Sequence, residues 1–295
     1  MRGTISLLML MFLCSVTACA QDMSGNHNHS TPAASPASSD NMVSQEWAKQ
    51  RVEKSPRHRE WVKVKNGARE VNSFVVYPEN KNKATAVIVI HEIFGMSDWV
   101  QSLTDQLAEA GYVAIAPDLL SGMGPNGGGT SSLSGNAVSQ AIQALPPDQI
   151  TGDLNAVADY ISKVPASNGK IVVTGYCWGG GQSFRYATNN PNVKAAFVFY
   201  GPAPASADGT PDKTALARIK APVYGFYAGN DARINATLPK TTEAMTELKK
   251  TYDPVTYEGA GHGFMRAGEA PDANEANKKA RDEAWARWKK ILAGI

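Results

Sequence analysis

The sequence has almost no excess of either charge. Its 295 residues hold 29 Lys and Arg against 27 Asp and Glu, a formal net charge of +2, and no basic stripe is visible. This balance argues against a nucleic-acid-binding protein. The run 127–129 is Gly-Gly-Gly without a following Lys-Ser or Lys-Thr, so it is no phosphate-binding loop. No metal-ligand cluster is visible in the main part of the chain, and we expect neither a metal nor an organic cofactor there.

The apolar run at the N-terminus is short. Ile5 to Val16 follows the positive Arg2 and is too short for a comfortable transmembrane helix, so residues 1–19 are typical of a targeting segment. The motif Val-Thr-Ala-Cys ending at Cys19 resembles a bacterial lipobox. It predicts lipidation of Cys19 and an exported, membrane-anchored lipoprotein that faces the periplasm or the cell exterior. The same region also fits an A-x-A cleavage site, which would leave a soluble periplasmic or secreted protein.

Cysteine occurs at only three positions. Cys14 lies in the targeting segment, and Cys19 is either lipidated or removed, so Cys177 cannot form an internal disulfide. A lone thiol in an oxidising compartment is exposed to oxidation unless it is shielded, which favours a chemical role for Cys177. Residues 20–42 are rich in Ser, Pro, Ala, Asn and His and read as a flexible tether, and residues 43–295 as a single domain.

Strands and helices alternate along this domain. A short helix (43–54) and a β-hairpin (60–64 and 70–77) precede the alternating part. Buried strands are predicted over 86–90, 112–116, 171–174, 195–200, 223–227 and 255–257, and helices over 98–110, 150–164, 238–250 and 273–292. The alternation predicts an α/β fold with a mostly parallel central sheet and helices on both faces. Residues 121–147, rich in Gly, Ser and Asn, interrupt it and are either a mobile cover or disordered.

The predicted active site is centred on a sharp turn between a strand and a helix. Gly175-Tyr-Cys-Trp-Gly179 has the G-x-C-x-G pattern of a nucleophile elbow, with Cys177 in the position that serine usually occupies. Flanking glycines are needed because the strained turn brings residues on either side of the nucleophile close together. The sulfur would sit at a helix N-terminus, which we expect to favour the thiolate.

A nucleophile of this kind needs a base, an acid that orients the base, and donors for an oxyanion. His262 is the only histidine after Cys177 and follows a predicted strand. Asp231 follows the strand 223–227 and should lie on the same rim of the sheet, whereas Asp253 precedes a strand and should lie on the other rim. One oxyanion donor should be the backbone N–H of Trp178, and the other should come from the turn 91–95.

Three motifs together resemble the dienelactone hydrolase family of α/β-hydrolases. They are G-Y-C-W-G-G at 175–180, H-E-I-F-G at 91–95 and G-H-G-F-M-R at 261–266, and the similarity extends over about residues 69–292. The resemblance implies an α/β-hydrolase fold and the family's catalytic triad at Cys177, Asp231 and His262.

The resemblance also implies roles for residues beside the triad. Glu92 matches a glutamate that interacts with the nucleophile thiol, and the Ile93 N–H matches an oxyanion donor. Arg266 matches an arginine that binds the carboxylate of the substrate. Dienelactone hydrolase itself has a second substrate-binding arginine in the long loop, but residues 121–148 contain no arginine or lysine. This departure argues against dienelactone itself as the substrate.

These observations predict a hydrolase that cleaves a small carboxylic ester or lactone through a thioester acyl-enzyme. Thioester or peptide hydrolysis is the alternative within enzymes, and a screen against thioesters would separate the two. A non-catalytic surface binding protein on the same fold is the alternative outside enzymes, although the complete Cys-Asp-His order argues against it.

Overall fold

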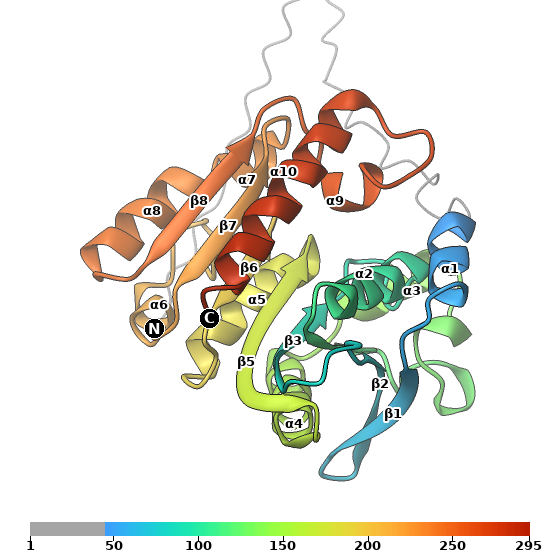
Figure 1. The fold of residues 1–295 in the computed structure, drawn as a ribbon. Coiled ribbons are helices and arrows are strands. Elements are labelled where there is room, and N and C mark those ends of the chain that lie inside the picture. Colours follow the sequence, from blue (N-terminus) through green and yellow to red (C-terminus); the bar gives the residue numbers. More distant parts are fainter. Residues whose placement is uncertain (1–44) are drawn as a thin grey trace, which may run out of the picture. The chain divides into compact units, whose positions relative to one another are not determined.

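A computed structural model describes residues 45–295, and the predicted targeting segment, the Cys19 lipidation site and the tether lie outside these residues. Eight strands form one sheet in the order β1-β2-β4-β3-β5-β6-β7-β8 (Figure 1). Their bounds are β1 Arg59–Asn66, β2 Arg69–Val76, β3 Ala84–Ile90, β4 Val113–Pro117, β5 Ser167–Tyr176, β6 Ala196–Phe199, β7 Val223–Ala228 and β8 Tyr252–Tyr257. The β1–β2 and β2–β4 pairs are antiparallel and the other pairs are parallel, which confirms the mostly parallel sheet.

Helices follow most of the strands. They are α1 Glu46–Glu53, α2 Asp98–Glu109, α3 Asn136–Gln143, α4 Pro147–Lys163, α5 Trp178–Asn189, α6 Lys213–Ala217, α7 Ala232–Asn235, α8 Leu238–Glu247, α9 Phe264–Ala267 and α10 Glu275–Leu292, with two 3₁₀ turns, η2 Pro125–Gly127 and η3 Thr130–Ser132. None of the helices in this part of the chain is long and apolar enough to cross a membrane.

The inner strands of the sheet are buried on both faces because they are apolar at successive positions. In β5, Ile171 and Val173 face one apolar cluster, whereas Val172 and Tyr176 face the other. The first cluster includes residues of α3, α4, α5, α6 and α8, and the second includes residues of α1, α2, α9 and α10. The fold is therefore a three-layer α/β arrangement, as predicted (Figure 1).

Segment 121–147 differs most from its prediction. It is folded: it contains η2, η3 and α3, and Val138, Ile142 and Leu145 are buried in the first apolar cluster. The short helix α6 was also not predicted. In α10, the buried stripe is Ala280, Ala284, Trp288 and Leu292, whereas Ile291 is only partly buried.

The remaining predicted elements are present with shifted ends. The strand predicted over 255–257 begins three residues earlier, at Tyr252, and β5 extends from Ser167 to Tyr176 rather than over 171–174. The turn of the hairpin contains Gly67 with φ +60°, as expected for its Asn-Gly sequence. The carboxyl ends of the parallel strands β3 to β8 share one edge of the sheet, and the predicted site residues follow these ends.

Candidate active site

The elbow between β5 and α5 has the backbone that the sequence predicted. Cys177 lies between the last residue of β5 and the first residue of α5, with φ 55° and ψ −118°. A Cβ added to Gly175 would lie 1.9 Å from the Gly179 oxygen, and one added to Gly179 would lie 2.4 Å from the Ile90 oxygen. Only glycine fits these two positions, which confirms the expected close approach.

Two backbone N–H groups stabilise the thiolate form of Cys177. They belong to Trp178, at the start of α5, and to Ile93, in the turn after β3, and hydrogen bonds from both lower the pKa of the thiol. An oxyanion formed at a carbonyl attacked by this sulfur would lie close to the same two donors. The structure thus brings both predicted oxyanion donors to the nucleophile.

The surroundings of the Cys177 thiol nevertheless favour its protonated form. Burial and, second, the negative charge of Glu92 raise the pKa of Cys177 to about 11, and these effects outweigh the two N–H donors and the positive Arg233. The N–H of Trp178 at the helix N-terminus acts in the expected direction, but burial outweighs it and the pKa of Cys177 is raised overall.

Glu92 is a buried carboxylate held by Arg266. Its side chain is 2% exposed, and its Oε2 accepts a hydrogen bond from Arg266 Nε over 2.8 Å. The charge of Glu92 is the main reason that the pKa of Arg266 is raised. The guanidinium also lies over the ring of Phe94, 5.2 Å from its centroid. Glu92 is thus neither solvated nor a helix cap, and it lies near the sulfur whose pKa it raises.

Asp231 and His262, the predicted acid and base, lie beside each other. Asp231 Oδ2 lies 2.5 Å from His262 Nδ1, and the carboxylate is buried while the imidazole is one-third exposed. Asp231 also caps α7, because its Oδ1 accepts from the Ile234 N–H. An ionised carboxylate can only accept, so Nδ1 carries the hydrogen and Nε2 is free to act as a base. Within residues 45–295 no hydrogen bond joins the His262 ring to the Cys177 thiol.

The rival acid lies at the other edge of the sheet. Asp253 is near the start of β8, is 57% exposed, and pairs with Arg287 Nη2 over 3.0 Å. The structure therefore places Asp231, and not Asp253, beside His262.

Two residues near the nucleophile were not predicted from the sequence. Arg233, an exposed residue of α7, lowers the pKa of Cys177 through its charge. Tyr200 follows β6 with φ 41°, and its ring packs edge-on against His262 with centroids 5.0 Å apart. In the described chain its buried hydroxyl has no hydrogen-bond partner. Both residues follow the carboxyl ends of strands, and this position in the sequence could have identified them as candidates for the site.

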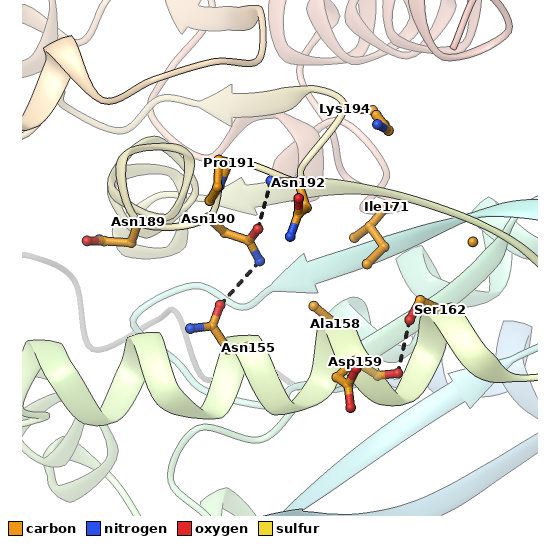
Figure 2. Close-up of a pocket in the computed structure, with 11 residues that line it drawn as sticks. Asn155, Ala158, Asp159, Ser162, Ile171, Asn189, Asn190, Pro191, Asn192 and Lys194 are labelled. Atoms are coloured by element: carbon orange, nitrogen blue, oxygen red, sulfur yellow. Dashed lines mark hydrogen bonds between the residues drawn. The ribbon is translucent and has the colours of Figure 1, made fainter.

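A hollow elsewhere on the surface is not part of this site. It measures about 650 Å³ and is lined mainly by polar side chains of α4 and of the segment between α5 and β6, including Asn155, Asn190 and Asn192 (Figure 2). Gly169 and Ile171, in the first half of β5, also line it, so it lies toward the amino ends of the strands. Across residues 45–295, no three His, Cys, Asp or Glu side chains are grouped to hold a metal ion.

The mostly parallel sheet, the strained elbow and the acid–histidine pair at the carboxyl edge define an α/β-hydrolase. Residues 71–295 match the family model described as "Dienelactone hydrolase family". The chain belongs to the dienelactone hydrolase family, and it is a hydrolase of the ester- and lactone-cleaving kind.

Known proteins resemble the chain over most of its length. Two relatives bear the name "Putative carboxymethylenebutenolidase". The one from Methylorubrum extorquens is 32% identical over 66% of this chain and 68% of its own, and the one from Saccharolobus solfataricus is 31% identical over 77% and 95%. The crystal structure of a "Putative Dienelactone Hydrolase" from Klebsiella pneumoniae has a TM-score of 0.70 and 25% identity, covering 81% of this chain and 99% of that one.

Proposed function

We propose that the chain hydrolyses a small carboxylic ester or lactone through a thioester on Cys177, with His262 as the base and Asp231 orienting it. One observation carries the proposal: Cys177 lies at a strained elbow at the start of α5, where the Trp178 and Ile93 N–H groups both lower the pKa of its thiol. This arrangement suits attack on a carbonyl carbon, because two preorganised N–H donors can stabilise the negative charge that develops on the carbonyl oxygen.

The reaction has two balanced halves. First, His262 Nε2 takes the thiol proton, the sulfur bonds to the carbonyl carbon, and the tetrahedral oxyanion collapses with release of the alkoxide, which receives the proton from His262. The product of this half is a thioester on Cys177. Then His262 removes a proton from water, the hydroxide adds to the thioester, and the thiolate leaves and regains the proton. Asp231 stabilises the imidazolium in both halves.

A pKa of about 11 for the Cys177 thiol makes general-base assistance necessary. Few molecules hold a preformed thiolate at neutral pH, so proton removal has to accompany attack. For this step the imidazole must come within hydrogen-bond reach of the sulfur when the substrate is bound. Separations of this kind are often longer in the free enzyme than in the substrate complex.

The guanidinium of Arg266 favours a substrate that bears a carboxylate. Within residues 45–295 its side chain donates only through Nε, which leaves both terminal nitrogens for a ligand, and the side chain is 18% exposed. Two parallel N–H donors match the geometry of a carboxylate. Because residues 121–148 supply no second cation, we expect a small anionic ester or lactone other than dienelactone.

A substrate panel tests the proposal. Purified protein is assayed with p-nitrophenyl acetate, small lactones, carboxylate-bearing esters and thioesters, each with and without prior alkylation by iodoacetamide. We expect ester or lactone turnover that alkylation abolishes. Turnover of thioesters alone would favour the thioesterase alternative, and no turnover of any substrate would favour the non-catalytic alternative.

We further propose that the protein is exported and anchored to a membrane through lipidated Cys19. The support is the sequence Val16-Thr17-Ala18-Cys19 and the polar stretch 20–42 that follows it. Acyl chains contribute about 0.8 kcal/mol per buried CH₂, so several chains would hold the enzyme firmly at the membrane surface.

A further inference from the structure

We propose that His91, Thr130 and Asp118 are positioning residues that hold the turn after β3 so that the Ile93 N–H points at the nucleophile. The inference rests on the proposed function, since it assigns a cause to one of the two oxyanion donors. It also gives the folded segment 121–147 a role in the active site.

His91 fixes one peptide plane of the turn. Its Nδ1 lies 2.9 Å from the Glu92 carbonyl oxygen, and its Nε2 accepts from the Leu119 N–H over 3.4 Å. Because Nε2 is the acceptor, Nδ1 carries the hydrogen and donates it to Glu92. The Glu92 C=O and the Ile93 N–H belong to the same planar trans peptide and point in opposite directions. Holding the carbonyl therefore aims the N–H.

The surroundings of His91 keep this arrangement in place. The ring is fully buried, and burial lowers its pKa, so the neutral form that the two hydrogen bonds require is favoured. It also stacks on the Trp178 ring, with centroids 5.5 Å apart and planes inclined by 14°. The residue that supplies the other oxyanion donor thus packs directly on the residue that aims the first.

Thr130 and Asp118 fix the far end of the turn. The Thr130 hydroxyl accepts from the Met96 N–H over 3.1 Å and donates to Asp118 Oδ1 over 2.7 Å. Asp118 Oδ2 accepts from the Thr130 N–H over 2.8 Å, which gives the threonine two bonds to one buried carboxylate. Thr130 packs so closely that a Cβ on Gly95 would lie 2.4 Å from its hydroxyl oxygen.

Two anchors therefore hold the turn after β3: the His91–Leu119 bond and the Met96–Thr130–Asp118 bonds. Both involve residues that directly follow β4. Leu119 and Asp118 are consecutive residues, and they connect to His91 directly and to Met96 through Thr130. The turn between these two points carries the Ile93 donor. Loss of either anchor should let the donor move, which weakens binding of the oxyanion more than binding of the ground-state substrate.

The test compares Thr130→Val with Thr130→Ser and Ser132→Ala. Valine keeps the shape of threonine but loses both hydroxyl bonds, and serine keeps the hydroxyl. Ser132 is the matched control, because among the described residues its hydroxyl donates to the Gly129 carbonyl, in the same segment, and makes no bond to the turn. We expect Thr130→Val to lower kcat about 10- to 100-fold and to leave KM within about threefold of wild type. Complete removal of an oxyanion donor lowers kcat by about 10²–10³, so a displaced donor should cost less. Thr130→Ser and Ser132→Ala should stay near wild type.

Hydrogen–deuterium exchange of the peptide covering residues 91–97 provides a readout that does not need turnover. We expect faster exchange in Thr130→Val than in wild type, Thr130→Ser or Ser132→Ala. Unchanged exchange, or an equal loss of kcat in all three variants, would overturn the inference. A wild-type protein without turnover, with exchange altered as expected, would instead contradict the proposed function while leaving the turn anchored as described.

Discussion

Arg266 Nε donates a hydrogen bond to Glu92 Oε2 over 2.8 Å and so joins the turn after β3 to the short helix α9, 174 residues later in the chain. The Glu92 carboxylate in this pair is almost completely buried, and its charge raises the pKa of the Cys177 thiol. One carboxylate therefore connects the residue proposed to bind the substrate with the residue proposed to attack it.

Replacing Glu92 should make the thiol more acidic. In Glu92→Gln the negative charge near the sulfur is lost, so the pKa of Cys177 should fall below its wild-type value of about 11. It should stay above the ordinary range of a thiol because burial, the larger cause, remains. The rate of iodoacetamide alkylation measured against pH reports this pKa. Asp253→Asn, which also removes an acid paired with an arginine, should leave the profile unchanged.

Arg266→Ala should change substrate preference. Loss of a charged hydrogen bond costs about 1.5–3 kcal/mol, or roughly 10- to 100-fold in kcat/KM. The loss should appear with a carboxylate-bearing ester and be small with its neutral methyl-ester analogue, measured on the same preparation. Equal losses on both substrates would mean that Arg266 serves only to hold Glu92.

The same substitution should lower stability. It leaves the carboxylate of Glu92, 2% exposed, without its partner, and breaking a fully buried pair costs about 3–5 kcal/mol. Because Arg266 is partly exposed, we expect a loss of at most about 3 kcal/mol in urea unfolding. The double variant Glu92→Gln/Arg266→Ala should recover part of it. No recovery would show that the arginine contributes through packing on Phe94 instead.

The acid of the triad can be tested with two matched variants. Asp231→Asn keeps an acceptor for the α7 cap but removes the charge beside His262, and a loss on the order of 10²–10⁴ in kcat is expected. Asp253→Asn should have no such effect, since Asp253 lies at the opposite edge of the sheet. The reverse result would transfer the acid's role to Asp253.

Most of the site could be predicted because it depends on sequence-local features. The elbow is a strand, a G-x-C-x-G turn and a helix in one continuous stretch, and Asp231 and His262 each follow a strand. Because parallel strands end at one edge, this position along the chain brought the pair together.

The rest of the site depends on contacts that the sequence does not encode locally. The Glu92–Arg266 pair and the Thr130–Met96 bond link distant segments, and the high pKa of Cys177 reflects burial in the folded domain. The buried spacing Val138, Ile142 and Leu145 was present in segment 121–147 but was hidden among Gly, Ser and Asn. The starts of β8 and β5 were missed because exposed residues, Asp253 in β8 and residues 168–170 in β5, interrupt the apolar pattern there.

Lipidation has its own measurement. Intact-mass analysis of the membrane fraction should show a mature protein that begins at Cys19 and carries acyl chains, and Cys19→Ser should leave the protein unlipidated. A mature protein that begins at an unmodified Gln21 would refute the anchor and leave the hydrolase assignment unaffected.

The central claim is that Cys177 carries the acyl group during turnover. Protein mixed with excess p-nitrophenyl acetate and quenched in acid should gain the mass of one acetyl group, and peptide mapping should place it on Cys177. Cys177→Ala should show neither the mass gain nor turnover while keeping a wild-type melting temperature. Acylation at another residue, or full turnover by Cys177→Ala, would contradict the assignment.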